Sequence, residues 1–251
     1  MAGRGRSRGA LALTVALAGA LGPVGCTPAL SGEHPPPLQN AAPAPADTHS
    51  DRVGVLLLDQ GATRSCTASV VDSPGHDLLV TAAHCVTDAG GTPVTGLVFA
   101  PGYRDGGTPL GEWTVDKVVV DPRWSDNADP EYDVAFLTVG PAAGRQIEDV
   151  VGGNPIGVNR GFGLAVTITG YPYDHEEPIT CSTTTTAQSS TQERFDCGGF
   201  SDGTSGSPWL TPDGSVVGVI GGYQQGGDTP DISYSVSFDD RVSSLYRQAT
   251  A

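Results

Sequence analysis

The sequence predicts an all-β protein made of two antiparallel six-stranded β-barrels followed by a short C-terminal helix. The composition supports this fold class, because 35 Gly, 20 Pro and a charged fraction of only 16% favour short strands joined by turns over long helices. A second observation is the repeated alternation of short β-branched or apolar runs with Gly, Pro and Asp clusters. The length of 251 residues is enough for two packed units.

Residues 1–26 have the features of an export signal. Arg4, Arg6 and Arg8 precede an apolar run that is followed by small residues. That run, residues 10–21, is too short to span a bilayer comfortably, so we expect a cleaved signal rather than a permanent anchor. The protein would then be secreted into an oxidising extracellular compartment.

Cys26, at the end of this segment, leaves an alternative to free secretion. It follows Gly25 in a way that resembles the lipid-attachment site of bacterial lipoproteins, although Pro23 stands where that pattern has a Leu-like residue. The protein would be bound to a membrane only if Cys26 is lipidated. Otherwise Cys26 simply lies near the signal-peptidase cut.

Residues 27–52 are rich in Pro, Ala, Ser and Thr and show no apolar periodicity. This composition predicts an extended, mobile linker or a short pro-segment. His34 and His49 lie in it, and we expect both to be solvated.

The first barrel is expected within residues 53–150, and residues 140–160 have few strand signals and predict a connection to the second. The strand-like runs are residues 53–58, 66–71, 77–82, 94–100, 114–121 and 134–139. Six strands fit a small closed barrel, which also hides the strand edges.

The second barrel and the terminal helix are expected within residues 151–251. The strand-like runs there are residues 164–169, 180–188, 194–197, 208–210, 215–220 and 233–238. Asp239 can cap a following helix that would place Val242, Leu245 and Tyr246 on one face.

The net charge of −15 argues against nucleic acids and anionic lipids as partners. An acidic surface repels phosphate backbones and anionic lipids, so we expect no nucleic-acid partner. The charge favours solubility, and we expect a monomer.

Apart from Cys26, the chain has four cysteines: Cys66, Cys85, Cys181 and Cys197. Four cysteines allow three pairings, and the sequence alone does not choose among them. We favour Cys66 with Cys85 and Cys181 with Cys197, which puts one bridge in each barrel. Zinc is the alternative, but the chain has no Cys-x-x-Cys pair and export favours disulfides, so we expect no metal.

Three side chains could act together in catalysis. His84 follows an apolar run that ends in small residues, and Asp133 begins another apolar run. A carboxylate there is costly to bury without a hydrogen-bond donor, and an imidazole N–H would be one. Ser205 lies in a Gly-rich turn, where the glycines allow a tight backbone and close approach of a substrate.

In this order, residues 81–85, 133–137 and 203–208 resemble the three signature segments of trypsin/chymotrypsin-like serine proteases. The resemblance implies two barrels with the active site between them and a serine endopeptidase that acts on polypeptides without a cofactor. His84, Asp133 and Ser205 would be the catalytic residues, and the N–H groups of Gly203 and Ser205 would form the oxyanion hole.

The chain departs from the animal digestive members at Thr204. Those members have an acid there, which pairs with a newly cut N-terminus and activates the zymogen. Arg52-Val53 could be such a cut, but Thr204 has no charge to receive the new ammonium group. We therefore expect Val53 to enter a strand. Residues 170–172 and 203–208 are closer to secreted bacterial members, including glutamyl endopeptidases.

The resemblance also implies a substrate pocket. Gly199 stands where trypsin-type members have the acid that receives Lys or Arg, which disfavours that preference, and Asp202 would lie at the rim. A wall would be formed by Ile220, Gly221, Gly222 and Tyr223. Glutamyl-specific relatives use a histidine in this wall, and none is present; we expect His76 and His175 at the surface.

Two other functions remain open. The chain could be a non-catalytic protease-like binding protein, or an esterase that uses the same three residues. None of the three key positions is substituted, which favours the protease. Labelling by a fluorophosphonate probe beside a Ser205→Ala control separates the catalytic from the non-catalytic alternative.

Overall fold

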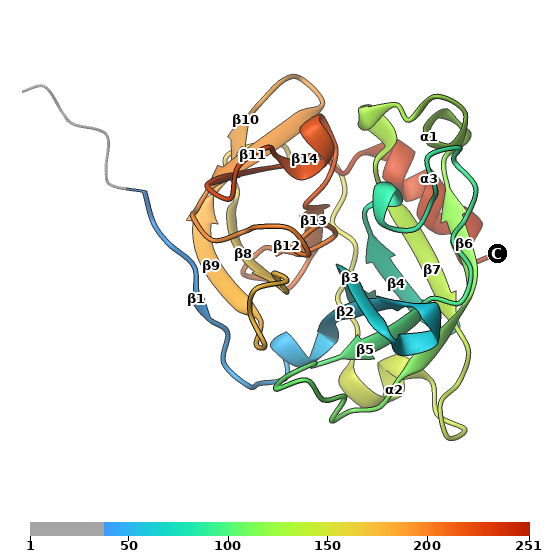
Figure 1. The fold of residues 1–251 in the computed structure, drawn as a ribbon. Helices are drawn as coiled ribbons and strands as arrows, with labels where there is room; N and C mark the ends of the chain where they lie inside the picture. Colours follow the sequence, from blue (N-terminus) through green and yellow to red (C-terminus); the bar gives the residue numbers. More distant parts are fainter. Residues whose placement is uncertain (1–37) are drawn as a thin grey trace, which may run out of the picture. The chain divides into compact units, whose positions relative to one another are not determined.

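The computed structural model describes residues 38–251, and Figure 1 shows their path. Strands dominate, as predicted, and the helices are few and short. The expected export signal, Cys26 and His34 lie outside the described residues. Within the described part, no helix combines the length and the apolar character needed to cross a membrane.

The N-terminal strands form a closed antiparallel barrel with the order β2-β3-β4-β7-β6-β5. Each strand lies on one of the predicted runs, with differences at the ends. The strands are β2 (Val53–Leu58), β3 (Thr63–Val71), β4 (Leu78–Thr81), β5 (Val98–Pro101), β6 (Trp113–Val120) and β7 (Ala135–Val139).

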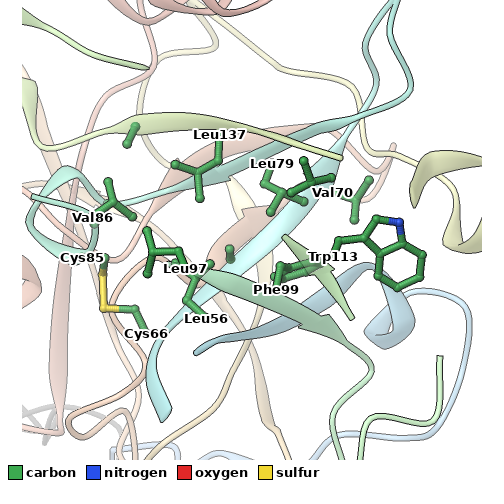
Figure 2. Packing of buried hydrophobic residues seen from close by; sticks show 14 of the residues in the cluster. Leu56, Cys66, Val70, Leu79, Cys85, Val86, Leu97, Phe99, Trp113 and Leu137 are labelled. Carbon is green, nitrogen blue, oxygen red and sulfur yellow. A yellow bond between two sulfur atoms is a disulfide. The ribbon is translucent and has the colours of Figure 1, made fainter. Parts of the chain in front are cut away.

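The barrel closes around side chains from alternate strand positions, which point to one face of a pleated sheet. Val70, Leu79 and Leu137 are register partners across β3, β4 and β7. Leu56 and Phe99 are partners on β2 and β5. All five are buried in one cluster, part of which Figure 2 shows. Burial of each such side chain contributes about 1.5–3 kcal/mol, so this core stabilises the barrel that supports the segments at its rim.

The C-terminal half consists of two sheets around a second core. One sheet has the order β1-β9-β8-β12-β13 and the other has the order β10-β11-β14. The strands are β1 (Ala42–Pro43), β8 (Ala165–Gly170), β9 (Ile179–Thr184), β10 (Thr186–Ala187), β11 (Gln192–Asp196), β12 (Pro208–Leu210), β13 (Val216–Val219) and β14 (Ile232–Val236). The predicted run 180–188 is thus divided between β9 and β10.

The second core is centred on aromatic contacts. Phe195 packs edge-on against both Trp209 and Phe200, with ring centroids 5.1 Å apart in each pair. Ile168 is the register partner of Trp209 and is also fully buried. These contacts support the strand that follows the Ser205 turn.

The predicted C-terminal helix is α3 (Asp240–Ala249). The Asp239 side chain caps it by accepting a hydrogen bond from the backbone N–H of Arg241. Val242 and Leu245 are buried, and the ring of Tyr246 contacts that of Phe136 on β7. The helix therefore returns to the N-terminal barrel, where Figure 1 shows it beside β6 and β7.

Two short helices were not predicted. Helix α1 (Pro122–Asn127) follows the cap Asp121, and α2 (Ile147–Val151) lies in the predicted connection. Asp121 before Pro122 is a helix-start signal that the sequence does contain. The 3-10 helices are η1 (Ser50–Arg52), η2 (Asp59–Gly61), η3 (Ala83–Cys85), η4 (Pro130–Tyr132) and η5 (Tyr223–Gly226).

The described part of the expected linker is ordered against both halves of the chain, which differs from the prediction of a mobile segment. Strand β1 pairs with the edge of β9, and the backbone N–H of Ala41 donates to the Gly198 carbonyl at 2.8 Å. The Arg104 side chain donates to the carbonyls of Ala44 (2.9 Å) and Pro45 (2.7 Å). These partners are distant in sequence, so composition could not predict them. His49 is exposed, as expected.

Both predicted disulfides are present. Cys66 is bonded to Cys85 and Cys181 to Cys197, with S–S distances of 2.08 and 2.07 Å. All four thiol groups are thus consumed, so they leave no thiolate for the zinc alternative. Closing loops of 19 and 16 residues stabilises the fold by about 3 kcal/mol each in the chain-entropy description.

Candidate active site

Three separate elements bring the predicted catalytic residues together. His84 lies in η3 just after β4, Asp133 lies between η4 and β7, and Ser205 lies in the turn before β12. His84 and Ser205 line one open cleft of about 960 Å³. The cleft is lined from both halves of the chain, since Cys66 of β3 and Ile220 after β13 also contribute.

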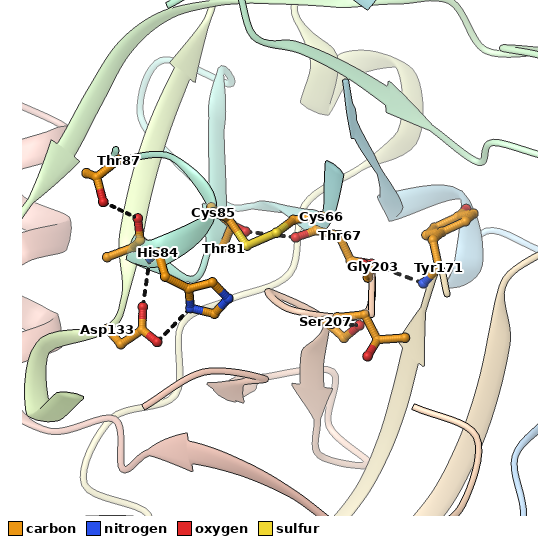
Figure 3. Close-up of a disulfide and its surroundings, with 12 residues drawn as sticks. Cys66, Thr67, Thr81, His84, Cys85, Thr87, Asp133, Tyr171, Gly203 and Ser207 are labelled. Atoms are coloured by element: carbon orange, nitrogen blue, oxygen red, sulfur yellow. Dashed lines mark hydrogen bonds and ion pairs between the residues drawn. A yellow bond between two sulfur atoms is a disulfide. The ribbon is translucent and has the colours of Figure 1, made fainter. Parts of the chain in front are cut away.

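Asp133 is fully buried and accepts hydrogen bonds from three groups. Its Oδ2 accepts from His84 Nδ1 at 2.8 Å and from the Gly222 backbone N–H at 2.8 Å, and its Oδ1 accepts from the His84 backbone N–H at 2.9 Å. These donors compensate for the burial of the carboxylate. Figure 3 shows the His84 ring turned toward Asp133, with its other nitrogen pointing away from the carboxylate.

The environment of His84 favours its protonated form. Burial alone lowers the pKa of the imidazole, but the charge of Asp133 and its hydrogen bond outweigh burial and raise the pKa above the ordinary 6.5. In the neutral ring, the Nδ1 proton is held by Asp133 and Nε2 is left as the basic nitrogen. Among residues 38–251 the Ser205 hydroxyl has no hydrogen bond, including to His84, and what the two residues share is the lining of the cleft.

The turn before Ser205 directs two backbone N–H groups away from the protein's own acceptors. Gly203 has φ +98°, and its preceding carbonyl, that of Asp202, accepts from Tyr173 N at 2.9 Å. The carbonyl of Thr204 accepts from Ser207 N at 3.0 Å. C=O and N–H point in opposite directions in a trans peptide, so the N–H groups of Gly203 and Ser205 point away from these donors. Neither N–H donates within the described residues.

The turn forms without a charged switch. Thr204 is buried, and its hydroxyl and backbone N–H both donate to the Ser201 carbonyl, at 2.7 and 3.1 Å. Val53 begins β2 as expected, is fully buried and pairs with Ser69. Neutral hydrogen bonds therefore hold this turn.

The predicted pocket residues separate into two groups. Asp202 and Ile220 line the cleft together with residues that the sequence did not reveal, among them Phe200 and Pro230. Four others do not line it: Gly199, Gly221, Gly222 and Tyr223. Phe200 directly follows Gly199. The sequence therefore identified this part of the cleft but not the residue that lines it.

Gly221 and Gly222 lie against Asp133 and do not line the cleft. Gly222 donates to its carboxylate, and a Cβ on Gly221 would lie 3.1 Å from Asp133 Oδ2. The side chain of Gln192 also reaches this region, since its amide donates to the Pro130 carbonyl at 3.0 Å. His76 and His175 are exposed, as expected.

Residues 66–219 match the family model of the trypsin-like peptidase domain. Two similar solved structures are protease Anisep from Arthrobacter nicotinovorans, with TM-score 0.72 and 25% identity over 82% of this chain and 98% of that one, and the thermostable serine protease AL20 from an extremophilic microorganism, with TM-score 0.71 and 26% identity over 81% and 99%. A Glu endopeptidase shares the fold at 18% identity and TM-score 0.69, over 84% of this chain and 97% of that one.

The comparison with curated proteins finds no match. The family model, in contrast, covers more than half of the chain and includes all three segments that carry His84, Asp133 and Ser205. The fold, the family model and these neighbours agree, and the chain belongs to the trypsin-like peptidase family.

Proposed function

We propose that this protein is a secreted serine endopeptidase that hydrolyses peptide bonds through His84, Asp133 and Ser205. The observation that carries the proposal is the buried Asp133 carboxylate, which binds the ring and the backbone of His84 at the edge of a cleft that Ser205 also lines. A buried carboxylate that orients an imidazole, in a cleft that a serine hydroxyl also lines, supplies the groups that nucleophilic catalysis requires.

Acylation uses each group in turn. Ser205 Oγ attacks the scissile carbonyl carbon while its proton passes to His84 Nε2, and the Asp133 carboxylate stabilises the imidazolium. The negative charge that develops on the carbonyl oxygen is received by the free N–H groups of Gly203 and Ser205. The C–N bond then breaks, and the amine leaves with the proton from His84.

Deacylation repeats the steps with water. His84 takes a proton from water, the resulting hydroxide attacks the ester carbonyl, and the same two N–H groups receive the oxyanion. Collapse of this intermediate returns the proton to Ser205 Oγ and releases the carboxylic acid. Side chains and backbone groups of this chain carry every step.

We propose that the residue before the cleaved bond is uncharged. Gly199 provides no carboxylate for Lys or Arg. A Glu side chain would meet the cleft's own carboxylates, among them Asp202 and Asp228, and no Lys or Arg lines the cleft. The apolar groups of Phe200 and Ile220 favour an apolar side chain instead. A peptide-library cleavage profile tests this preference.

Secretion is part of the same proposal. It is supported by the basic and apolar start of the sequence and by the two disulfides, which persist in oxidising compartments. Membrane attachment is expected only if Cys26 is lipidated. We further propose residues 53–150 and 151–251 as the two barrel domains of a monomer, with α3 returning to the first.

Labelling with a fluorophosphonate tests the proposed function. The full-length protein should label at neutral pH, and the Ser205→Ala variant should not, because the label attaches to the Ser205 oxygen. Cleavage of a peptide amide beside the matching ester then separates a peptidase from an esterase. A parent protein that labels no better than Ser205→Ala would contradict the catalytic proposal.

Such a negative result would favour a non-catalytic binding protein. The human heparin binding protein has the same fold at 14% identity and TM-score 0.62, over 84% of this chain and 97% of that one. Its ligand is not expected here, since the net charge of −15 repels a polyanion.

A further inference from the structure

The side chain of Thr67 connects the N-terminal barrel to the turn that carries Ser205. Thr67 lies on β3, directly after the disulfide-bonded Cys66, and is fully buried. Its hydroxyl donates to the Gly203 carbonyl at 3.0 Å and accepts from the backbone N–H of Tyr171 at 3.0 Å. Both partners belong to the C-terminal half and lie more than a hundred positions away in the sequence.

The direction of these hydrogen bonds is determined by chemistry. A backbone N–H can only donate, so the hydroxyl oxygen must accept from Tyr171. Its single proton is then directed to the Gly203 carbonyl, which can only accept. The hydroxyl of Thr67 therefore has one arrangement that satisfies all three groups.

The backbone of Thr67 makes two further contacts that hold it in place. Its N–H donates to the Ser205 carbonyl at 2.8 Å, and its carbonyl accepts from the Thr81 hydroxyl at 2.8 Å. A Cβ on Gly206 would lie 2.1 Å from the Thr67 carbonyl oxygen, so the nucleophile turn packs directly on this residue. Figure 3 shows Thr67 between the Cys66–Cys85 bridge and Gly203.

Gly203 needs such a restraint because it has no side chain and sits at φ +98°, in a region that glycine enters and leaves readily. The peptide before it is held by the hydrogen bond from Tyr173 to the Asp202 carbonyl. The peptide after it is held by Thr67. The Gly203 N–H belongs to the peptide before it. The peptide that Thr67 holds connects that peptide to the one that carries the Ser205 N–H, so its rotation would change how the two N–H groups lie relative to each other.

We propose that Thr67 is a positioning residue for the oxyanion hole, which its hydroxyl keeps formed from the opposite barrel. This inference rests on the proposed peptidase function. It also explains how the turn keeps its shape although Thr204 offers no carboxylate for an ion pair.

The test replaces Thr67 with Val, which has the same shape and keeps the backbone N–H but lacks the hydroxyl. Loss of an oxyanion donor costs roughly 100- to 1,000-fold in rate, so loosening one should lower kcat by roughly 10- to 100-fold. KM should change little, because the contact acts on the transition state. Thr67→Ser, which restores the hydroxyl, should recover most of kcat.

Thr211→Val is the matched control. Thr211 is also a buried threonine, and the acceptors of its hydroxyl are the Asp213 carboxylate and the Ser215 carbonyl at 3.1 Å, neither of which belongs to the Ser205 turn. It should lose stability without losing kcat. If Thr67→Val does not accumulate, Thr67→Ala gives the same comparison. An unchanged kcat in the hydroxyl-less variant, or a loss that Thr67→Ser does not recover, overturns the inference.

A second readout is independent of turnover. Crystal structures of the parent and of Thr67→Val should show one orientation of the Gly203 peptides in the parent and more than one in the variant. An unchanged single orientation overturns the role of Thr67 even if the parent is inactive. Failure of the parent to label with a fluorophosphonate, by contrast, contradicts the proposed function itself.

Discussion

At the scale of single residues, the hydrogen bonds of Asp133 contribute both to the stability of the fold and to the proposed catalysis. Its carboxylate is fully buried, and its three hydrogen-bond donors come from His84 and Gly222. An unpaired carboxylate in this position would cost several kcal/mol. The same contacts that make its burial tolerable also fix the tautomer and the orientation of the imidazole.

Replacing Asp133 with Asn should therefore reduce the rate far more than the stability. An amide in this place favours the wrong imidazole tautomer, so we expect kcat to fall by about 10³- to 10⁴-fold. Steady-state kinetics with a peptide substrate measure the loss, and thermal unfolding shows whether the fold persists. A folded variant with near-parent kcat at neutral pH would contradict the assigned role.

The pH dependence of activity should report the raised pKa of His84. The neutral imidazole is the base, and Asp133 raises its pKa above 6.5. The value of kcat/KM should thus fall as the pH is lowered through an inflection that lies above 6.5 in the free enzyme. In Asp133→Asn the inflection should move down, because the charge that stabilises the imidazolium is gone. An inflection that stays in place would show that another group titrates.

Glu193 is a second buried acid, away from the described cleft. Its Oε2 has no hydrogen-bond partner among residues 38–251, and burial raises its pKa from 4.5 to about 7. The folded state therefore holds a proton that the unfolded state releases between these values. The contribution of this carboxyl to the free energy of unfolding should be greatest below pH 4.5 and should be lost as the pH rises to about 7.

Glu193→Gln should remove this decline and stabilise the protein above pH 7 by about 2–3 kcal/mol. Urea unfolding at acidic and alkaline pH measures the effect. Glu176→Gln, at an exposed position, should leave the pH dependence as it is in the parent. Equal pH dependence in the parent and Glu193→Gln would show that this carboxyl is not the cause.

At the scale of elements, β1 extends the folded region beyond the first barrel strand. It adds to the edge of β9, and the hydrogen bonds between Gly198 and the segment at Gln39 and Ala41 lie next to Gly199. A Cβ on Gly199 would be only 3.5 Å from that of Ala41. The segment thus supports the backbone that leads into Phe200 and the cleft.

If the protein is secreted as proposed, we therefore expect its mature form to begin upstream of Gln39. A cut at Arg52-Val53 would free β1 and remove the covalent connection that holds it at the sheet edge. Intact mass and N-terminal sequencing of the active protein from culture medium give the answer. An active protein that begins at Val53 and no longer retains residues 39–45 would contradict this expectation.

At the scale of the whole molecule, the charge of −15 is combined with a cleft whose charged lining side chains are Asp174, Asp202 and Asp228, besides His84. Such a field attracts cationic polypeptides, and salt screens it because the three carboxylates are exposed.

With the residue before the cleaved bond kept uncharged, peptides with Lys at neighbouring positions should accordingly be cleaved with higher kcat/KM than matched peptides with Glu there. The difference should shrink as the salt concentration rises from about 0.05 to 1 M. Asp202→Asn should weaken the salt effect more than Asp116→Asn, which changes an exposed carboxylate on β6 outside the cleft. A salt-independent ratio would contradict this electrostatic selection.

Much of this architecture follows from local patterns. The strand runs, the Asp239 cap and the local disulfides are all present as predicted, because alternation, capping and short loops depend on neighbouring residues. The pairing of His84 with Asp133 was predictable because a buried acid needs a donor. The residues that line the cleft beside Ser205 were less predictable, since Phe200 and Pro230 belong to no recognisable motif.

By itself, the sequence determined that this chain is all-β, which three segments carry its chemistry, and that a neutral Thr204 replaces a charged switch. The tertiary structure alone decided which groups hold the Ser205 turn and where the chain before Val53 lies. The hydrogen bond from the Thr67 hydroxyl to the Gly203 carbonyl and the pairing of β1 with β9 join groups that are distant in sequence. Backbone donors and acceptors occur along the whole chain, so no local pattern marks the ones that will meet a distant partner.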